Sequence, residues 1–247
     1  MRKLIIASIL LLVPALASAA GGHAVHLEDA NIDLADQASL QRGAKYFVNY
    51  CMGCHSLQYM RYNRMAADIG IDEVELRQNL ILDGSKPGDL MTNAMRPEDG
   101  EKWFGTAVPD LTLVTRWRSP DWLYTYLKTF YTDTARPYGV NNLVFPDVGM
   151  PHVLAPLQGV QNPVFEEKEG PDGEMVKQVV GIEPAQGGTM TAEAYDEMVR
   201  DLTNFLTYAG EPMKLERQRL GIYVLLFLGL FFILAYALKK EYWKDVH

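Results

Sequence analysis

The sequence contains 247 residues, of which 48% are hydrophobic and 22% are charged, as in ordinary globular proteins. Its formal net charge of -8 gives no electrostatic support to nucleic-acid binding, which needs an excess of positive charge. An acidic surface would attract a cationic partner, and a solvated acidic face without a partner is an equally good interpretation.

The first segment has the pattern of a secretory signal peptide. A positively charged start is followed by an apolar run over residues 4–17 and by small residues up to Ala20. This order is typical of a leader that is removed on export. An uncleaved anchor is the alternative, which Pro14 and the shortness of the run disfavour. We therefore predict a signal peptide at residues 1–20.

Three segments of the exported region, residues 21–213, have helical patterns. The first leads into the cysteine pair and carries apolar residues at Leu40, Ala44 and Phe47. The second is predicted to begin at Ser119 as N-cap, with Pro120 in its first turn. Its apolar side would carry Leu123, Leu127, Phe130 and Tyr131. The third runs from Thr191 to Gly210.

Residues 162–188 differ from the rest of the exported region because they are polar, acidic and rich in Gly and Pro. Within them, Val176–Ile182 is the only candidate for hairpin material. We predict a mostly α domain with long loops and a small irregular insertion here.

A second apolar run, from Leu220 to Leu238, contains no charged residue. A helix of this length spans about 28 Å, close to the thickness of bilayer hydrocarbon. Positive residues flank both ends, so their count does not set the orientation. Because the predicted signal peptide exports the region before this run, we predict a transmembrane helix at residues 214–240 that leaves residues 241–247 in the cytoplasm. A buried core helix is the alternative, but such long uncharged runs are rare in soluble folds.

The sequence contains two cysteines, Cys51 and Cys54, and His55 follows them directly. Two thiols at this spacing can form thioethers to the vinyl groups of one haem, and the adjacent histidine can coordinate its iron. A zinc site is disfavoured because a second cysteine pair is lacking, and a redox dithiol because it needs a βαβ setting. The pattern predicts one covalently attached c-type haem in a cytochrome c-like domain.

An electron-carrying haem needs a sixth iron ligand, and methionine opposite histidine raises its potential. Met150 lies in the segment Phe145–Pro156, whose three prolines would hold a weak thioether ligand at little entropic cost. His152 is the rival ligand. From the residues alone, Met150 can also be an ordinary core or loop methionine.

The propionates of a haem need cationic or hydrogen-bonding partners when they are buried. Arg116 and Arg118 flank Trp117, and either guanidinium can form a bidentate contact to a carboxylate. A pair of solvent-facing arginines is the more common situation, so the residues alone do not decide.

Four segments, in order, resemble the cytochrome c1 family of bacterial type. Arg42–Arg64 resembles its haem-attachment region, and Pro109–Thr112 resembles the Pro-Pro-Asp-Leu-Ser segment that lines one side of its haem. Phe145–Pro151 is similar to its axial-methionine loop, and Phe205–Pro212 to the region before its anchor. The resemblance covers nearly the whole mature chain.

This resemblance implies roles for single residues. Met150 would be the sixth ligand opposite His55, and Pro109 would contribute to the haem wall. Arg118, rather than Arg116, would bind a propionate.

Two positions depart from the family pattern. Val108 stands in place of a proline, and Asp147 in place of a glycine. Both are near the expected haem edge, but neither removes a ligand.

The resemblance further implies the haem subunit of the cytochrome bc1 complex, ubiquinol–cytochrome c reductase. Such a subunit receives electrons one at a time from the Rieske iron–sulfur protein and passes them to a soluble or membrane-bound cytochrome c. It is an electron-transfer subunit and not an enzyme on its own. Its expected partners are the cytochrome b subunit, the Rieske protein and cytochrome c, within a dimer of the whole complex.

The expected location is the bacterial inner membrane, crossed once, with the haem domain in the periplasm and the C-terminus in the cytoplasm. One alternative is a membrane-anchored monohaem cytochrome of another respiratory complex, such as a terminal oxidase. Another is a five-coordinate haem sensor or peroxidase-like enzyme, which would need an open distal side.

Overall fold

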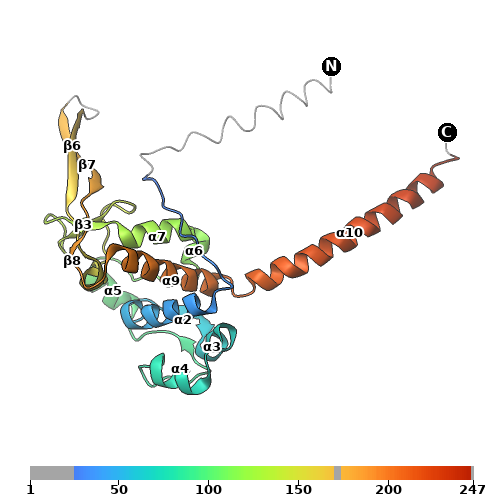
Figure 1. Ribbon diagram of the computed structural model, residues 1–247, viewed down its shortest axis with the longest axis horizontal. Coiled ribbons are helices and arrows are strands. Elements are labelled where there is room, and N and C mark those ends of the chain that lie inside the picture. The colour runs from blue at the N-terminus through green and yellow to red at the C-terminus, as the bar shows by residue number, and fades with distance from the viewer. Residues whose placement is uncertain (1–24, 170–173, 246–247) are drawn as a thin grey trace.

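The computed structural model describes residues 25–169 and 174–245. The predicted signal peptide at residues 1–20 lies outside the described residues. Figure 1 shows a helical body from which two elements project: the strand pair β6–β7 and the long helix α10.

Helices make up most of the regular structure, as predicted. They are α2 (Gln37–Tyr46), the π-helical turn η2 (Phe47–Cys51), α3 (Tyr62–Ile69), α4 (Glu73–Asn79), α5 (Pro97–Phe104), α6 (Val114–Trp117), α7 (Pro120–Lys128), α8 (Ala155–Gln158), α9 (Ala192–Gly210) and α10 (Lys214–Tyr242).

The strands of the described residues form four antiparallel pairs. These are β1 (Leu57–Arg61) with β2 (Leu90–Met91), β3 (Phe130–Thr132) with β4 (Val140–Asn142), β5 (Gly159–Val160) with β8 (Gln186–Gly187), and β6 (Pro163–Glu169) with β7 (Met175–Ile182). The pair β6–β7 contains the predicted hairpin segment.

Two of the predicted helix starts are confirmed. The Ser119 hydroxyl accepts a hydrogen bond from the Trp122 amide at 3.2 Å, at the start of α7. The Thr191 hydroxyl accepts from the Ala194 amide at 3.3 Å, at the start of α9. Both side chains satisfy amides that the first turn of a helix leaves without partners.

The predicted apolar side of the second helix was wrong at Phe130 and Tyr131, which lie in β3. The helix ends at Lys128 because side-chain amides bond its last carbonyls. Gln158 and Gln161 donate to the Lys128 carbonyl at 2.9 and 2.8 Å. These donors are about thirty positions away, and a local pattern does not reveal them.

The core forms where α2 packs against α9, which lie side by side in Figure 1. Gly43 makes this close approach possible, because a Cβ there would lie 2.1 Å from the Asp201 carbonyl oxygen. Beside it, the Arg42 guanidinium binds the buried Asp201 carboxylate through two hydrogen bonds, of 2.5 and 2.9 Å. The Phe47 and Phe205 rings pack 5.8 Å apart. This crossing fixes the helix that leads into the cysteine pair.

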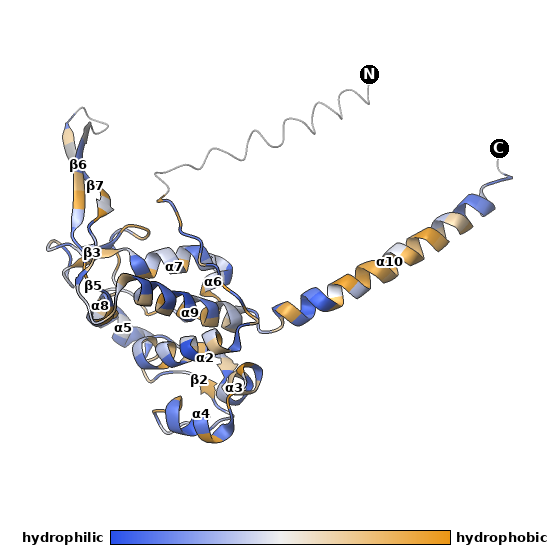
Figure 2. Ribbon diagram, viewed as in Figure 1, coloured by the Kyte–Doolittle hydropathy of each residue, from blue (hydrophilic) through white to orange (hydrophobic). Residues whose placement is uncertain are grey.

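Helix α10 is long and apolar enough to cross a membrane, and none of its residues is buried. Figure 2 shows its hydrophobic middle and its hydrophilic ends, and the helix extends away from the body. These features fit the predicted anchor.

We expect Gly43→Ala to lower the free energy of unfolding by about 3 kcal/mol, because the added methyl group forces the α2 and α9 backbones apart. Thermal and urea unfolding of the detergent-solubilised protein measure this. Gly88→Ala is the control, since a Cβ at Gly88 has nothing within 4 Å. Equal stability of the two variants would contradict the role of the α2–α9 crossing.

Candidate haem-binding site

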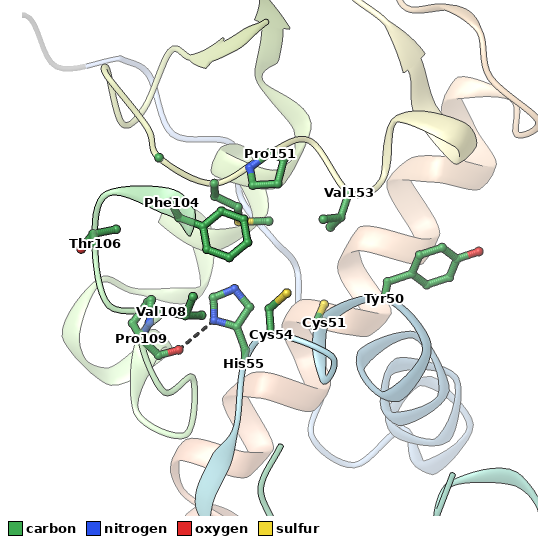
Figure 3. A pocket seen from close by; sticks show the side chains of 12 residues that line it. Tyr50, Cys51, Cys54, His55, Phe104, Thr106, Val108, Pro109, Pro151 and Val153 are labelled. Carbon is green, nitrogen blue, oxygen red and sulfur yellow. Dashed lines mark hydrogen bonds between the residues drawn. The ribbon is translucent and has the colours of Figure 1, made fainter. Parts of the chain in front are cut away.

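A pocket of about 530 Å³, partly open to solvent, lies between three segments that are distant in sequence. Its lining is mostly apolar and consists of Tyr50, Cys51, Cys54, His55, Phe104, Thr106, Val108, Pro109, Gly149, Met150, Pro151 and Val153. Figure 3 shows the two cysteines beside the His55 ring, with Phe104, Pro151 and Val153 across the hollow. Five of the six predicted site residues therefore line one pocket.

The orientation of His55 is set by one hydrogen bond. Its Nδ1 lies 2.7 Å from the Pro109 carbonyl oxygen (Figure 3). A carbonyl only accepts, so Nδ1 carries the proton and Nε2 keeps a free lone pair. Burial lowers the pKa of His55, against the opposing effects of the Pro109 carbonyl and Asp110. The ring is therefore neutral at neutral pH, as a metal ligand must be.

Asp110 ties the Pro109 loop to the segment after His55. One carboxylate oxygen accepts from the Gln58 amide at 2.7 Å, and the other from the Thr112 amide at 2.9 Å. The Leu111 amide adds a bond of 3.0 Å to the Ser56 carbonyl. The Pro-Asp-Leu-Thr segment thus places a carbonyl oxygen at Nδ1 of the histidine.

Cys51 and Cys54 lie at the end of η2 in a tight turn. The amides of Cys54 and His55 both donate to the Cys51 carbonyl, at 3.0 and 2.8 Å. Burial raises the pKa of the Cys51 thiol to about 12, with a smaller contribution from Cys54. Within residues 25–169 and 174–245, no three His, Cys, Asp or Glu side chains converge on a metal position.

Met150 and His152, the rival ligands, have different surroundings. Met150 lines the pocket, and the Tyr126 hydroxyl donates to its sulfur at 3.3 Å. His152 is not among the lining residues, and its ring stacks on Phe130 at 4.7 Å. Burial lowers the pKa of His152 to about 4. The thioether of Met150 therefore lines the same pocket as His55, whereas the imidazole of His152 does not.

Arg136 fixes the loop that carries Met150. Its guanidinium donates to the Asp147 carboxylate at 3.0 Å and to the Asp147 carbonyl at 2.6 Å. Asp147 has a φ of +61°, a conformation that favours glycine. The departure from the family pattern at this position thus keeps the left-handed turn and adds an ion pair that holds it.

Arg118 is the predicted site residue that does not line the pocket. Its guanidinium carbon lies 4.1 Å from the ring centre of Trp117, 5.0 Å from that of Trp122 and 5.7 Å from that of Phe145. Such contacts to ring faces favour a cation. In the described part of the chain, no carboxylate lies within 4.0 Å of this guanidinium.

The donor set fits a c-type haem. The pocket combines two thiols, one imidazole lone pair and one thioether sulfur with apolar walls, which are the groups that such a haem uses. No local sequence signal singles out Phe104 or Tyr126. Phe104 ends α5 just before Gly105, whose φ of +76° marks a common helix end.

Comparison with known proteins gives a consistent result. Residues 28–246 match the cytochrome C1 family. The chain is 66% identical to a cytochrome c1 of Allochromatium vinosum over all of both chains. It is 50% identical, over 96% of each chain, to a Nitrosomonas europaea protein named ammonia monooxygenase gamma subunit. It is 26% identical to a cytochrome c1 of Rhodospirillum rubrum, over 99% of this chain and 97% of the relative.

We expect Asp110→Ala to lower the free energy of unfolding by about 2 kcal/mol, because it removes two hydrogen bonds to a charged group, one of which joins the Pro109 loop to the distant Gln58. Urea unfolding measures the loss. Asp83→Ala is the control, since among the described residues the Asp83 carboxylate accepts only from the nearby Ser85 amide and hydroxyl. A loss at Asp83 as large as that at Asp110 would show that the link to Gln58 is not what matters.

Proposed function

The chain belongs to the cytochrome c1 family, whose members are the haem subunit of the bc1 complex, and from this premise we propose that it passes single electrons from the Rieske iron–sulfur protein to a cytochrome c. Proteins of this family carry one covalently bound c-type haem and are membrane-anchored subunits. The subunit is not catalytic by itself.

One observation carries the proposal: two thiols, a neutral imidazole and a thioether line the same apolar pocket. Cys51 and Cys54 would form the thioether links to the haem, and His55 Nε2 and the Met150 sulfur would be the two protein ligands of its iron. When bound, the haem supplies one-electron chemistry between ferrous and ferric iron. The apolar lining disfavours the more highly charged ferric state, and methionine ligation acts in the same direction.

The remaining residues keep the site rigid. The Pro109 carbonyl holds the His55 ring in one tautomer and makes Nε2 a better donor. Asp110 and Arg136 fix the two loops that face each other across the pocket. Phe104, Val108 and Val153 limit the access of water. Ligands that do not move between oxidation states suit a subunit that exchanges electrons without making bonds.

We propose that residues 21–213 are periplasmic, that residues 214–240 cross the bacterial inner membrane, and that residues 241–247 are cytoplasmic. The proposal rests on the apolar, unburied α10 and on the sequence pattern of a signal peptide at residues 1–20. A tail anchor of this kind places the haem domain at the membrane surface, within reach of cytochrome b and the Rieske protein. A cationic cytochrome c suits the acidic chain.

Purification through a C-terminal tag in mild detergent tests the function. We expect cytochrome b and the iron–sulfur protein to accompany the wild-type chain, which should give a haem-stained band on a denaturing gel. The double variant Cys51→Ser, Cys54→Ser should give no stained band, because no thioether can form. Recovery of terminal oxidase subunits instead would favour the other respiratory complex, and a stained band in the double variant would exclude our haem assignment.

We expect Arg118→Ala to lower the free energy of unfolding of the haem-loaded protein by about 2 kcal/mol and to change its potential, because a propionate would lose its cationic partner. The cost is below that of a fully buried pair, since Arg118 is only partly buried. Arg118→Lys should restore part of it, because the charge returns without the planar fork. Urea unfolding and redox titration are the measurements.

Arg116→Ala is the matched control, since Arg116 is an exposed arginine two positions away. It should leave both quantities nearly unchanged. Small and equal effects at the two positions would mean that Arg118 binds no propionate.

A further inference from the structure

We propose that Tyr126 is a positioning residue: its hydroxyl holds the Met150 sulfur by a hydrogen bond and thereby raises the potential of the haem. The inference rests on the proposed function, because it concerns the ligand assigned there. It assigns a role to a side chain that does not itself line the pocket.

The contact is specific. The Tyr126 hydroxyl donates to the Met150 sulfur at 3.3 Å. Among the described residues, this sulfur is the only hydrogen-bond partner of the hydroxyl. Tyr126 is buried, so water competes little for the hydroxyl. A hydroxyl without an acceptor would be costly at such a position, and the sulfur is what the fold provides.

The tyrosine ring is held on two sides, so the hydroxyl points in a fixed direction. Trp122, one turn earlier on α7, stacks on the ring with centroids 5.0 Å apart and planes within 8°. Phe130 packs edge-on at 5.1 Å. The Tyr126 carbonyl also accepts a hydrogen bond from the Asn142 amide group at 2.7 Å. Packing already fixes the ring, so forming the hydrogen bond to the sulfur costs little further conformational entropy.

A thioether sulfur has two lone pairs. One can coordinate iron while the other accepts the tyrosine hydrogen bond, so the two contacts are compatible. A hydrogen bond withdraws electron density from the sulfur, which then donates less to the iron. Ferric iron depends more on this donation than ferrous iron, so the bond favours the ferrous state and raises the potential.

Tyr126→Phe in the full-length protein, within its native complex, tests the inference. It keeps the ring that packs on Trp122 and Phe130 and removes only the hydroxyl. We expect a lower midpoint potential, with a roughly two- to threefold smaller ratio of ferrous to ferric haem at a fixed solution potential. The sulfur-to-iron charge-transfer band of the ferric protein should shift but persist.

Tyr195→Phe is the matched control for the loss of a buried tyrosine hydroxyl. The Tyr195 hydroxyl donates to the Leu127 carbonyl oxygen at 2.9 Å, so its hydrogen bond goes to a backbone oxygen and not to a thioether sulfur. We expect a similar loss of thermal stability in both variants, and a change of potential and band in Tyr126→Phe alone.

Met150→Leu distinguishes the assignment of Met150 as an iron ligand from the role of Tyr126. It should abolish the charge-transfer band, lower the potential further and allow carbon monoxide to bind. If Met150→Leu has these effects while Tyr126→Phe leaves potential and band unchanged, the ligand is correct and the role of Tyr126 is wrong. If Met150→Leu changes none of them, the ligand assignment fails and the inference fails with it.

Discussion

The hydrogen bond between His55 and the Pro109 carbonyl is the contact on which the chemistry of the pocket depends. It joins the cysteine segment to a loop more than fifty positions away and selects the tautomer with a free Nε2. A rotated carbonyl or a shifted loop would leave that nitrogen without a fixed direction. Much of the surrounding structure holds one of these two groups in place: the α2–α9 crossing on the histidine side and the Asp110 bonds on the carbonyl side.

Local sequence signals predicted the parts of the fold that local interactions determine. Ser119 and Thr191 could be identified as helix caps because a cap bonds an amide three positions away. The cysteine spacing pointed to the haem for the same reason, since one turn of chain carries both thiols and the imidazole. The end of α7 was missed because Gln158 and Gln161 determine it from a distance.

In the candidate site too, local patterns indicate some residues, while contacts between distant segments decide others. Met150 was singled out by its proline-rich loop, yet the residues alone left His152 open as the ligand. What separates them is the stacking of His152 on Phe130, which comes from another segment. Arg118 could be chosen over Arg116 only through the family resemblance. The structure places its guanidinium among three aromatic rings and outside the pocket lining.

Helix α7 has two faces with different tasks, and this explains why the role of Tyr126 was not visible in the sequence. Leu123 and Leu127 follow the helical period and lie in the core. Trp122 and Tyr126 follow the same period one position earlier. Trp122 contacts the Arg118 guanidinium and stacks on Tyr126, which bonds the Met150 sulfur. One short helix thus links the residue proposed to bind a propionate to the residue proposed to bind the iron, so a shift of α7 would affect both residues together.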